Sequence, residues 1–82
     1  MRQIVKDWHD ADRQLHEHST RGTSFELLVG TKDRFFTVRS IRHIDNGVRF
    51  ELGSSRGTVV FVETTHGSDE VTISIHSNND RP

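Results

Sequence analysis

The sequence predicts an α+β fold in which an N-terminal amphipathic helix packs on a curled five-stranded antiparallel meander. Two observations lead to this prediction. Apolar residues recur first at helical spacing, and beyond Gly22 they recur at every second position in a series of short runs. Segments rich in Gly, Asn, Ser and Asp separate these runs and are typical of tight turns. The helix is therefore expected to cover one face or one end of the sheet.

The helix is predicted from about residue 2 to residue 18. Its apolar stripe has spacings of four, three and four residues: Ile4, Trp8, Ala11 and Leu15. Val5 widens this stripe on one flank, and Trp8 at its centre is expected to belong to the core. Gly22 offers a position at which the chain can leave the helix and turn.

Alternation begins in the first strand, SFELLVG, where every second residue is apolar. The second strand is longer and runs through RFFTVRSIRHI. Phe36 and Val38 share one face of it, whereas Ile41 and Ile44 fall out of step. This change of phase predicts a bulge or a strong bend near residues 39–40.

Asp45-Asn46-Gly47 is the strongest turn signal, because Asn and Gly tolerate the positive φ angles of tight hairpins. The third strand, VRFEL, alternates cleanly after it. The fourth strand, TVVFVE, is apolar on both faces and is expected to be the most buried, and VTISI supplies the fifth. Residues 1–77 are thus predicted to form a single α+β domain, followed by a flexible polar tail at 78–82.

A long, bent second strand favours a sheet that curls into a partly closed SH3-like or Sm-like barrel, since closure protects strand edges. The order of one helix and five strands is similar to that of Sm-like proteins, and SSRGTVV resembles their Arg-Gly segment. In this chain the segment precedes the fourth strand instead of the last, and the paired glycine and aspartate pattern of that family is absent. The resemblance therefore stops at the architecture.

Composition excludes several classes of site. The 82 residues include no cysteine, which rules out disulfides, thiolate zinc sites and cysteine nucleophiles. The N-terminal stretch has no apolar run of signal-peptide length, and no stretch approaches the roughly 18 apolar residues of a membrane span. A cytoplasmic protein without membrane association is expected.

The stretch WHDADRQLHEH, residues 8–18, combines three histidines with three acidic residues. On a helix Asp12 can pair with either His9 or His16. Those histidines are about 10 Å apart along the axis, too far to hold one ion together, so a metal would need a third ligand from the sheet such as His43 or His66. We expect a solvated polar flank with weak local pairs, and neither a metal nor a cofactor.

Catalytic motifs are absent from the sequence. TTHGSDE contains His66, Ser68 and Asp69, but a triad needs groups that converge from different segments around an oxyanion hole. The glycines occur singly at turns, and none opens a helix after a strand as phosphate-binding loops do. A domain with so small a core also has little room for a deep pocket. We therefore expect a protein that is not an enzyme.

The basic middle segment supplies the candidate binding surface. Residues 24–57 carry six basic and four acidic residues, whereas residues 58–82 carry one basic and four acidic ones. The candidate binding residues are Arg34, Phe35, Arg39, Arg42 and Arg49. Arginines beside an aromatic side chain can bind single-stranded nucleic acid. The same arginines can instead form weak cross-strand pairs with Glu26, Glu51 and Glu63.

These observations lead to two functional hypotheses. The first is a small protein-binding module that acts as a regulator or inhibitor, and whose edge strands add to a partner's sheet or to a second copy. Domains of this size are common among phage and mobile-element accessory proteins that block host systems, which extends the hypothesis to such a role. The alternative is a nucleic-acid-binding domain that uses the arginines of the curled sheet.

Overall fold

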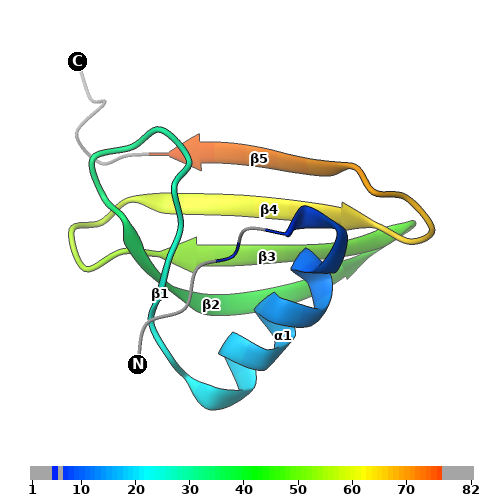
Figure 1. Cartoon of the computed structure of the whole chain (residues 1–82), viewed down its shortest axis with the longest axis horizontal. Helices are drawn as coiled ribbons and strands as arrows, with labels where there is room; N and C mark the ends of the chain where they lie inside the picture. Colours follow the sequence, from blue (N-terminus) through cyan, green and yellow to red (C-terminus); the bar gives the residue numbers. More distant parts are fainter. Residues whose placement is uncertain (1–4, 6, 77–82) are drawn as a thin grey trace.

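The computed structural model describes residue 5 and residues 7–76. Its elements, in chain order, are η1 (Trp8–Asp10), α1 (Ala11–Arg21), β1 (Phe25–Glu26), β2 (Phe35–Ile44), β3 (Gly47–Gly53), β4 (Val59–Thr65) and β5 (Val71–His76). The strands form one antiparallel sheet in the order β1-β2-β3-β4-β5, and α1 packs on one face of it (Figure 1). The predicted α+β class is confirmed. The predicted tail at 78–82 lies outside the described residues.

The prediction that the helix begins near residue 2 and ends at residue 18 is wrong at both ends. Val5 is not helical, and the Asp7 side chain accepts a hydrogen bond of 3.0 Å from the backbone N–H of His9, which starts the 3₁₀ turn η1. α1 then continues to Arg21. Gly22 closes it in the left-handed region at φ 65°, as the sequence predicted. Ile4 lies outside the described residues.

The late start of the helix moves Trp8 away from the centre of the core. Trp8 lies in η1 and is half-buried against the core, so its predicted place in the core is confirmed only in part. Ala11 and Leu15 are buried as predicted, and His18 completes the buried face of α1. The His18 ring stacks on Phe25 with 4.4 Å between the centroids, and burial lowers the pKa of this histidine.

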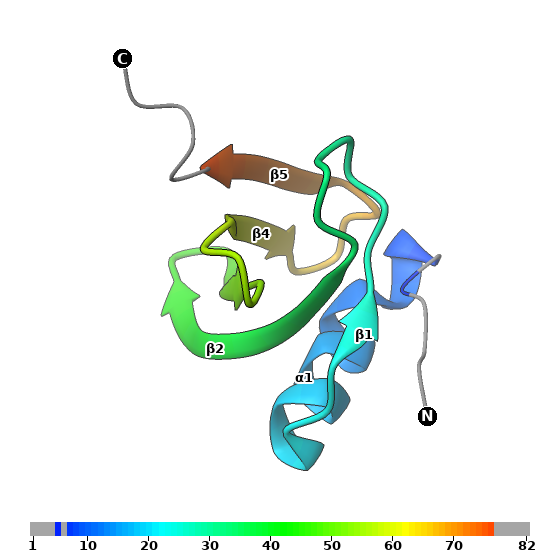
Figure 2. The ribbon, with the colours of Figure 1, turned by 90° about the vertical axis from the view of Figure 1, so that its left-hand side faces the viewer.

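The bend in β2 is where the sequence predicted it. The β2–β3 register shifts between Val38 and Ser40, so that Arg39 is the additional residue of a bulge. Figure 2 shows β2 as a strongly bent ribbon that leads from β1 round to β3. The first strand is shorter than predicted, because only Phe25 and Glu26 pair with β2.

The β2–β3 turn has the predicted place and a different geometry. Ile44 pairs with Gly47 across Asp45 and Asn46, yet neither of those residues nor Gly47 has a positive φ. Gly47 is required for another reason. A Cβ atom built there would lie 1.8 Å from the carbonyl oxygen of Thr64, so only glycine permits this approach of β3 to β4.

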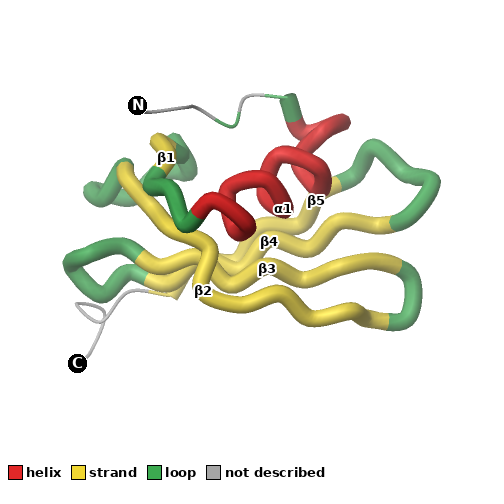
Figure 3. Tube along the Cα trace, turned by 90° about the horizontal axis from the view of Figure 1, so that it is seen from below, coloured by secondary structure: helices red, strands yellow, loops and turns green. Residues whose placement is uncertain are grey.

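The core lies between α1 and the sheet face that it covers (Figure 3). Its largest buried side chains come from five segments: Leu15, Phe25, Leu27, Phe36, Val48, Phe50, Leu52, Val60 and Val62. The prediction that β4 is the most buried strand is wrong, because β3 is buried at five of its seven positions and β4 at three of seven. Val60 and Val62 are buried, whereas Val59 and Phe61 on the other face are half-buried, because no described element covers that side.

The sheet curls into a half-barrel and does not close. In the described part of the chain β1 pairs with β2 and β5 pairs with β4, and no pairing joins β1 to β5. β5 is therefore an edge strand (Figure 1). No described helix combines the length and the apolar character that crossing a membrane requires.

Candidate functional site

The face of the sheet opposite α1 carries the polar side chains of β2 to β5, and we call it the outer face. Two rows of residues cross it. In the first row the register aligns Arg42, Arg49, Glu63 and Thr72, and in the second it aligns Ser40, Glu51, Phe61 and Ser74. In β3 and β4 the row residues alternate with buried ones, so period-2 alternation places their side chains on the outer face. In β2 and β5 they alternate with Ile41, Val71 and Ile73, which pack against the core.

Arg42 and Arg49 are direct cross-strand neighbours. Like charges in this position repel each other and destabilise a sheet. The positive charge of Arg49 is partly balanced. Its Nε lies 3.4 Å from Glu63 Oε2, and its guanidinium lies 4.3 Å from the centroid of the Phe61 ring. The contact with Glu63 is an ion pair without hydrogen-bond geometry, since the buried Nε has no hydrogen-bond partner.

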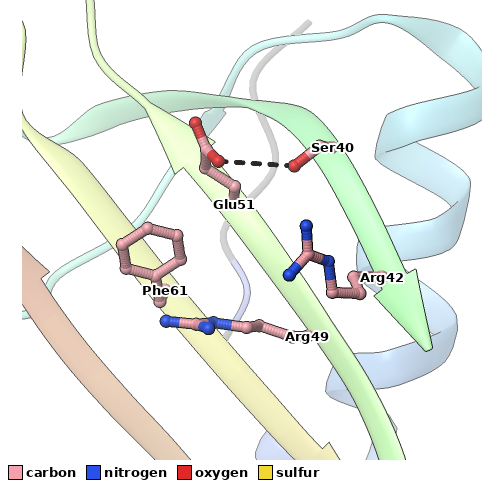
Figure 4. Close-up of a pocket in the computed structure, with 5 residues that line it drawn as sticks. All are labelled: Ser40, Arg42, Arg49, Glu51 and Phe61. Atoms are coloured by element: carbon pink, nitrogen blue, oxygen red, sulfur yellow. Dashed lines mark hydrogen bonds between the residues drawn. The ribbon is translucent and has the colours of Figure 1, made fainter. Parts of the chain in front are cut away.

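A depression of about 240 Å³ opens between these side chains, lined by Ser40, Arg42, Arg49, Glu51 and Phe61. In Figure 4 the guanidinium of Arg42 extends from β2 over β3 towards the middle of this group. Ser40 donates a hydrogen bond of 3.4 Å to Glu51, which holds that carboxylate at one rim. Arg42 is exposed and has no acidic group within ion-pair distance among the residues that the structure describes.

The five predicted binding residues are divided between two regions. Arg42 and Arg49 line the depression, whereas Arg34 pairs with Glu26 at 2.7 Å beside β1. Phe35 lies with Arg34 at that end of the sheet. Of the pairs predicted with Glu26, Glu51 and Glu63, those with Glu26 and Glu63 are confirmed. The pair with Glu51 does not form among the described residues, and Glu51 accepts a hydrogen bond from Ser40 instead.

Arg39 does not join Arg49 as the candidate surface implied. Its side chain covers Gly53 so closely that a Cβ atom there would lie 2.1 Å from the Arg39 Nε. Sequence reasoning also missed Phe61 as the aromatic residue of the depression. The available signal was its place in the register opposite Glu51, which the length of the β3–β4 turn determines.

The histidine-rich stretch forms one of the predicted local pairs, since His16 Nε2 lies 3.0 Å from Asp12 Oδ1. His9 pairs outside the stretch instead, because its Nδ1 lies 3.0 Å from Asp69 Oδ1 in the β4–β5 loop. The Asp69 carboxylate raises the pKa of His9. Among residue 5 and residues 7–76, no three His, Asp or Glu side chains are grouped closely enough to hold a metal ion.

The β4–β5 loop does not assemble a triad. The Ser68 hydroxyl accepts a hydrogen bond of 3.1 Å from the Glu70 backbone N–H, and Asp69 points to His9 on the helix. These contacts stabilise the loop, and they direct Asp69 to His9 and not to His66.

β5 presents a different kind of surface from the arginines. Its six residues, VTISIH, include no Asp, Glu, Lys, Arg or Pro. Val71 and Ile73 are half-buried against the core, and Ile75 is 40% exposed. Within the described residues no strand pairs with the outer edge of β5. The strand thus combines a free edge in this part of the chain with apolar side chains that the helix leaves partly uncovered.

Comparisons with protein-family models, with curated proteins and with solved structures found no match.

Proposed function

We propose that this protein is a protein-binding module that receives an extended segment of its partner along β5. The observation that carries the proposal is the free edge of β5, which has neither charge nor proline and bears a partly exposed apolar row. Edge strands of proteins are usually protected by charged residues, by proline or by a covering segment. β5 has neither of the first two.

Strand addition explains how so small a domain binds a partner without a deep pocket. The backbone of the added strand hydrogen-bonds to the free edge, and its alternate side chains extend the row of Val71, Ile73 and Ile75. The matching segment of the partner has an apolar residue at every second position. These side chains lie on the face of the sheet that α1 covers. Binding of this kind occupies the partner's segment, which is the action of a non-enzymatic regulator or inhibitor.

Capture of a partner by edge variants tests the proposal. Ile75→Lys places a charge on the exposed end of the apolar row, and Leu28→Lys is the matched control, since Leu28 is a 62% exposed leucine outside the strands. We expect the parent and Leu28→Lys to capture the same protein from a nuclease-treated lysate, and Ile75→Lys to lose it. Hydrogen exchange should show that the partner protects the β5 amides.

Two outcomes contradict the proposal. One is capture that Ile75→Lys leaves unchanged, which would place the interface elsewhere. The other is capture that nuclease abolishes and that weakens by orders of magnitude as salt rises, which would indicate nucleic acid as the ligand.

A further inference from the structure

We infer that the depression on the outer face binds one side-chain carboxylate of an acidic peptide, held by Arg42 from β2 and Arg49 from β3. This site lies on the face of the sheet and not at its β5 edge, so it does not depend on the strand-addition proposal. Three features of the described residues support it: a pair of like charges of which one is balanced, a guanidinium held over an aromatic ring, and walls that suit a peptide better than a phosphate chain.

The two arginines are only partly balanced within the described residues. Arg42 and Arg49 are opposite each other in the register, and Glu63 balances one of these two charges. The Glu51 carboxylate shares the depression with Arg42 but accepts its hydrogen bond from Ser40. Bringing an anion between the arginines changes their repulsion into two attractions, so the ligand-bound state removes a cost that the free protein carries.

Arg49 is held in place before any ligand arrives. Its guanidinium lies over the Phe61 ring, and Phe61 also makes an edge contact with the His76 ring at 5.4 Å between centroids. A donor that is already ordered loses little conformational entropy on binding. Arg42 extends into the depression as the second donor (Figure 4).

The walls of the depression favour a peptide carboxylate over nucleic acid. Glu51 lies at one rim and Glu63 lies beside Arg49, and both repel an incoming anion. This repulsion is larger for a chain of successive phosphates than for one carboxylate, because more charges are brought close to the two glutamates. The net charge of −1 also opposes a polyanion. An acidic peptide is chemically complementary to the lining of the depression. Its carboxylate can bind the arginines, its methylene groups can contact Phe61, and a backbone N–H can donate to Glu51.

The test uses NMR of the arginine Nε–Hε groups during titration with a blocked peptide, acetyl-Gly-Glu-Gly-Glu-Gly-amide. We expect this peptide to shift the signals of Arg42 and Arg49, and the matched peptide with Gln in place of Glu to leave them unchanged. Arg42→Gln should weaken the binding about tenfold, the loss of one charge-assisted hydrogen bond. Arg39→Gln is the control on the same strand, and it should bind like the parent.

Thermal melting of each variant keeps the test interpretable. Because Arg42→Gln removes repulsion, we expect its Tm to equal or exceed that of the parent, so weaker binding cannot come from unfolding. The inference is overturned if the Gln peptide binds as well as the Glu peptide, or if Arg42→Gln binds as tightly as the parent. It is equally overturned if inorganic phosphate or a ten-nucleotide thymidine strand shifts Arg42 and Arg49 at lower concentration than the Glu peptide does.

Discussion

Two polar regions of this protein are built in opposite ways. At one end of the sheet Asp33 joins the β1–β2 loop to the β3–β4 turn, and its side chain, 8% exposed, accepts hydrogen bonds from the hydroxyls of Ser54, at 2.8 Å, and Thr58. Arg56 lies 3.6 Å away as an ionic partner. On the outer face, Arg42 and Arg49 oppose each other without such mutual satisfaction. The contacts of Asp33 stabilise the folded protein, whereas the two arginines reach a balanced state when an anionic ligand binds between them.

The Asp33 cluster also organises the turn that it binds. The Ser54 hydroxyl accepts hydrogen bonds from the backbone N–H groups of Arg56 and Thr58, and the Ser54 N–H donates to the Thr58 carbonyl at 2.9 Å. Each side chain therefore has partners within the protein. Removing one member leaves buried polar groups unsatisfied, which is the most costly change that a polar substitution can make here.

The largest effect is expected for Asp33→Ala. The buried hydroxyls of Ser54 and Thr58 lose their acceptor, at about 1 to 3 kcal/mol for each unsatisfied group, so the free energy of unfolding should fall by several kcal/mol. Urea unfolding measures it, with Glu70→Ala as the control on an exposed acid. A loss no larger than that of Glu70→Ala would show that the cluster does not support the fold.

Acid should act through the same cluster. The hydrogen bonds from Thr58 and Ser54 lower the pKa of Asp33 below its ordinary 3.8. A carboxyl with a depressed folded-state pKa contributes stability that is present above 3.8 and is lost as pH falls through the lower, folded-state value. Stability measured from pH 5 to pH 2 should therefore fall less in Asp33→Asn than in the parent. Parallel curves would contradict this assignment.

The smallest effect is expected at His9, which is exposed. Asp69 raises its pKa above the ordinary 6.5, so the contribution of this pair is present below pH 6.5 and is lost as pH rises through the raised, folded-state value. We expect a slight fall of the parent's Tm between pH 6 and pH 8 that Asp69→Asn lacks, measured at low salt. If the Tm of both proteins falls equally between pH 6 and pH 8, the fall comes from the titration of another group.

The sequence predicted the parts of the fold that depend on local periodicity. Alternation located β2 to β5, and the change of phase after Val38 located the bulge, because a single inserted residue reverses the side-chain faces. The helix start was mispredicted because the apolar spacing extends to Ile4, whereas the Asp7 cap decides where helical geometry begins. Periodicity does not contain that information.

The candidate site could be predicted in part for the same reason. Alternation indicated that Arg49 points away from the core, but its cross-strand partner, Arg42, is determined by the two-residue turn between β2 and β3. Phe61 lies in a run that is apolar on both faces, so its outward direction depends on which side α1 covers. The open β5 edge depends on the failure of β1 to reach it, which is a property of the whole sheet.

The most direct test of the contrast between the two regions is a pair of double-mutant cycles measured by unfolding of the free protein. Arg42→Gln with Arg49→Gln should give a repulsive coupling of about 0.2 to 1 kcal/mol that salt reduces, whereas Asp33→Ala with Ser54→Ala should give an attractive coupling of about 1 kcal/mol or more. These opposite signs are the result that the structure predicts. An attractive coupling between Arg42 and Arg49 would mean that both regions serve folding, and it would contradict the assignment of the outer face to a ligand.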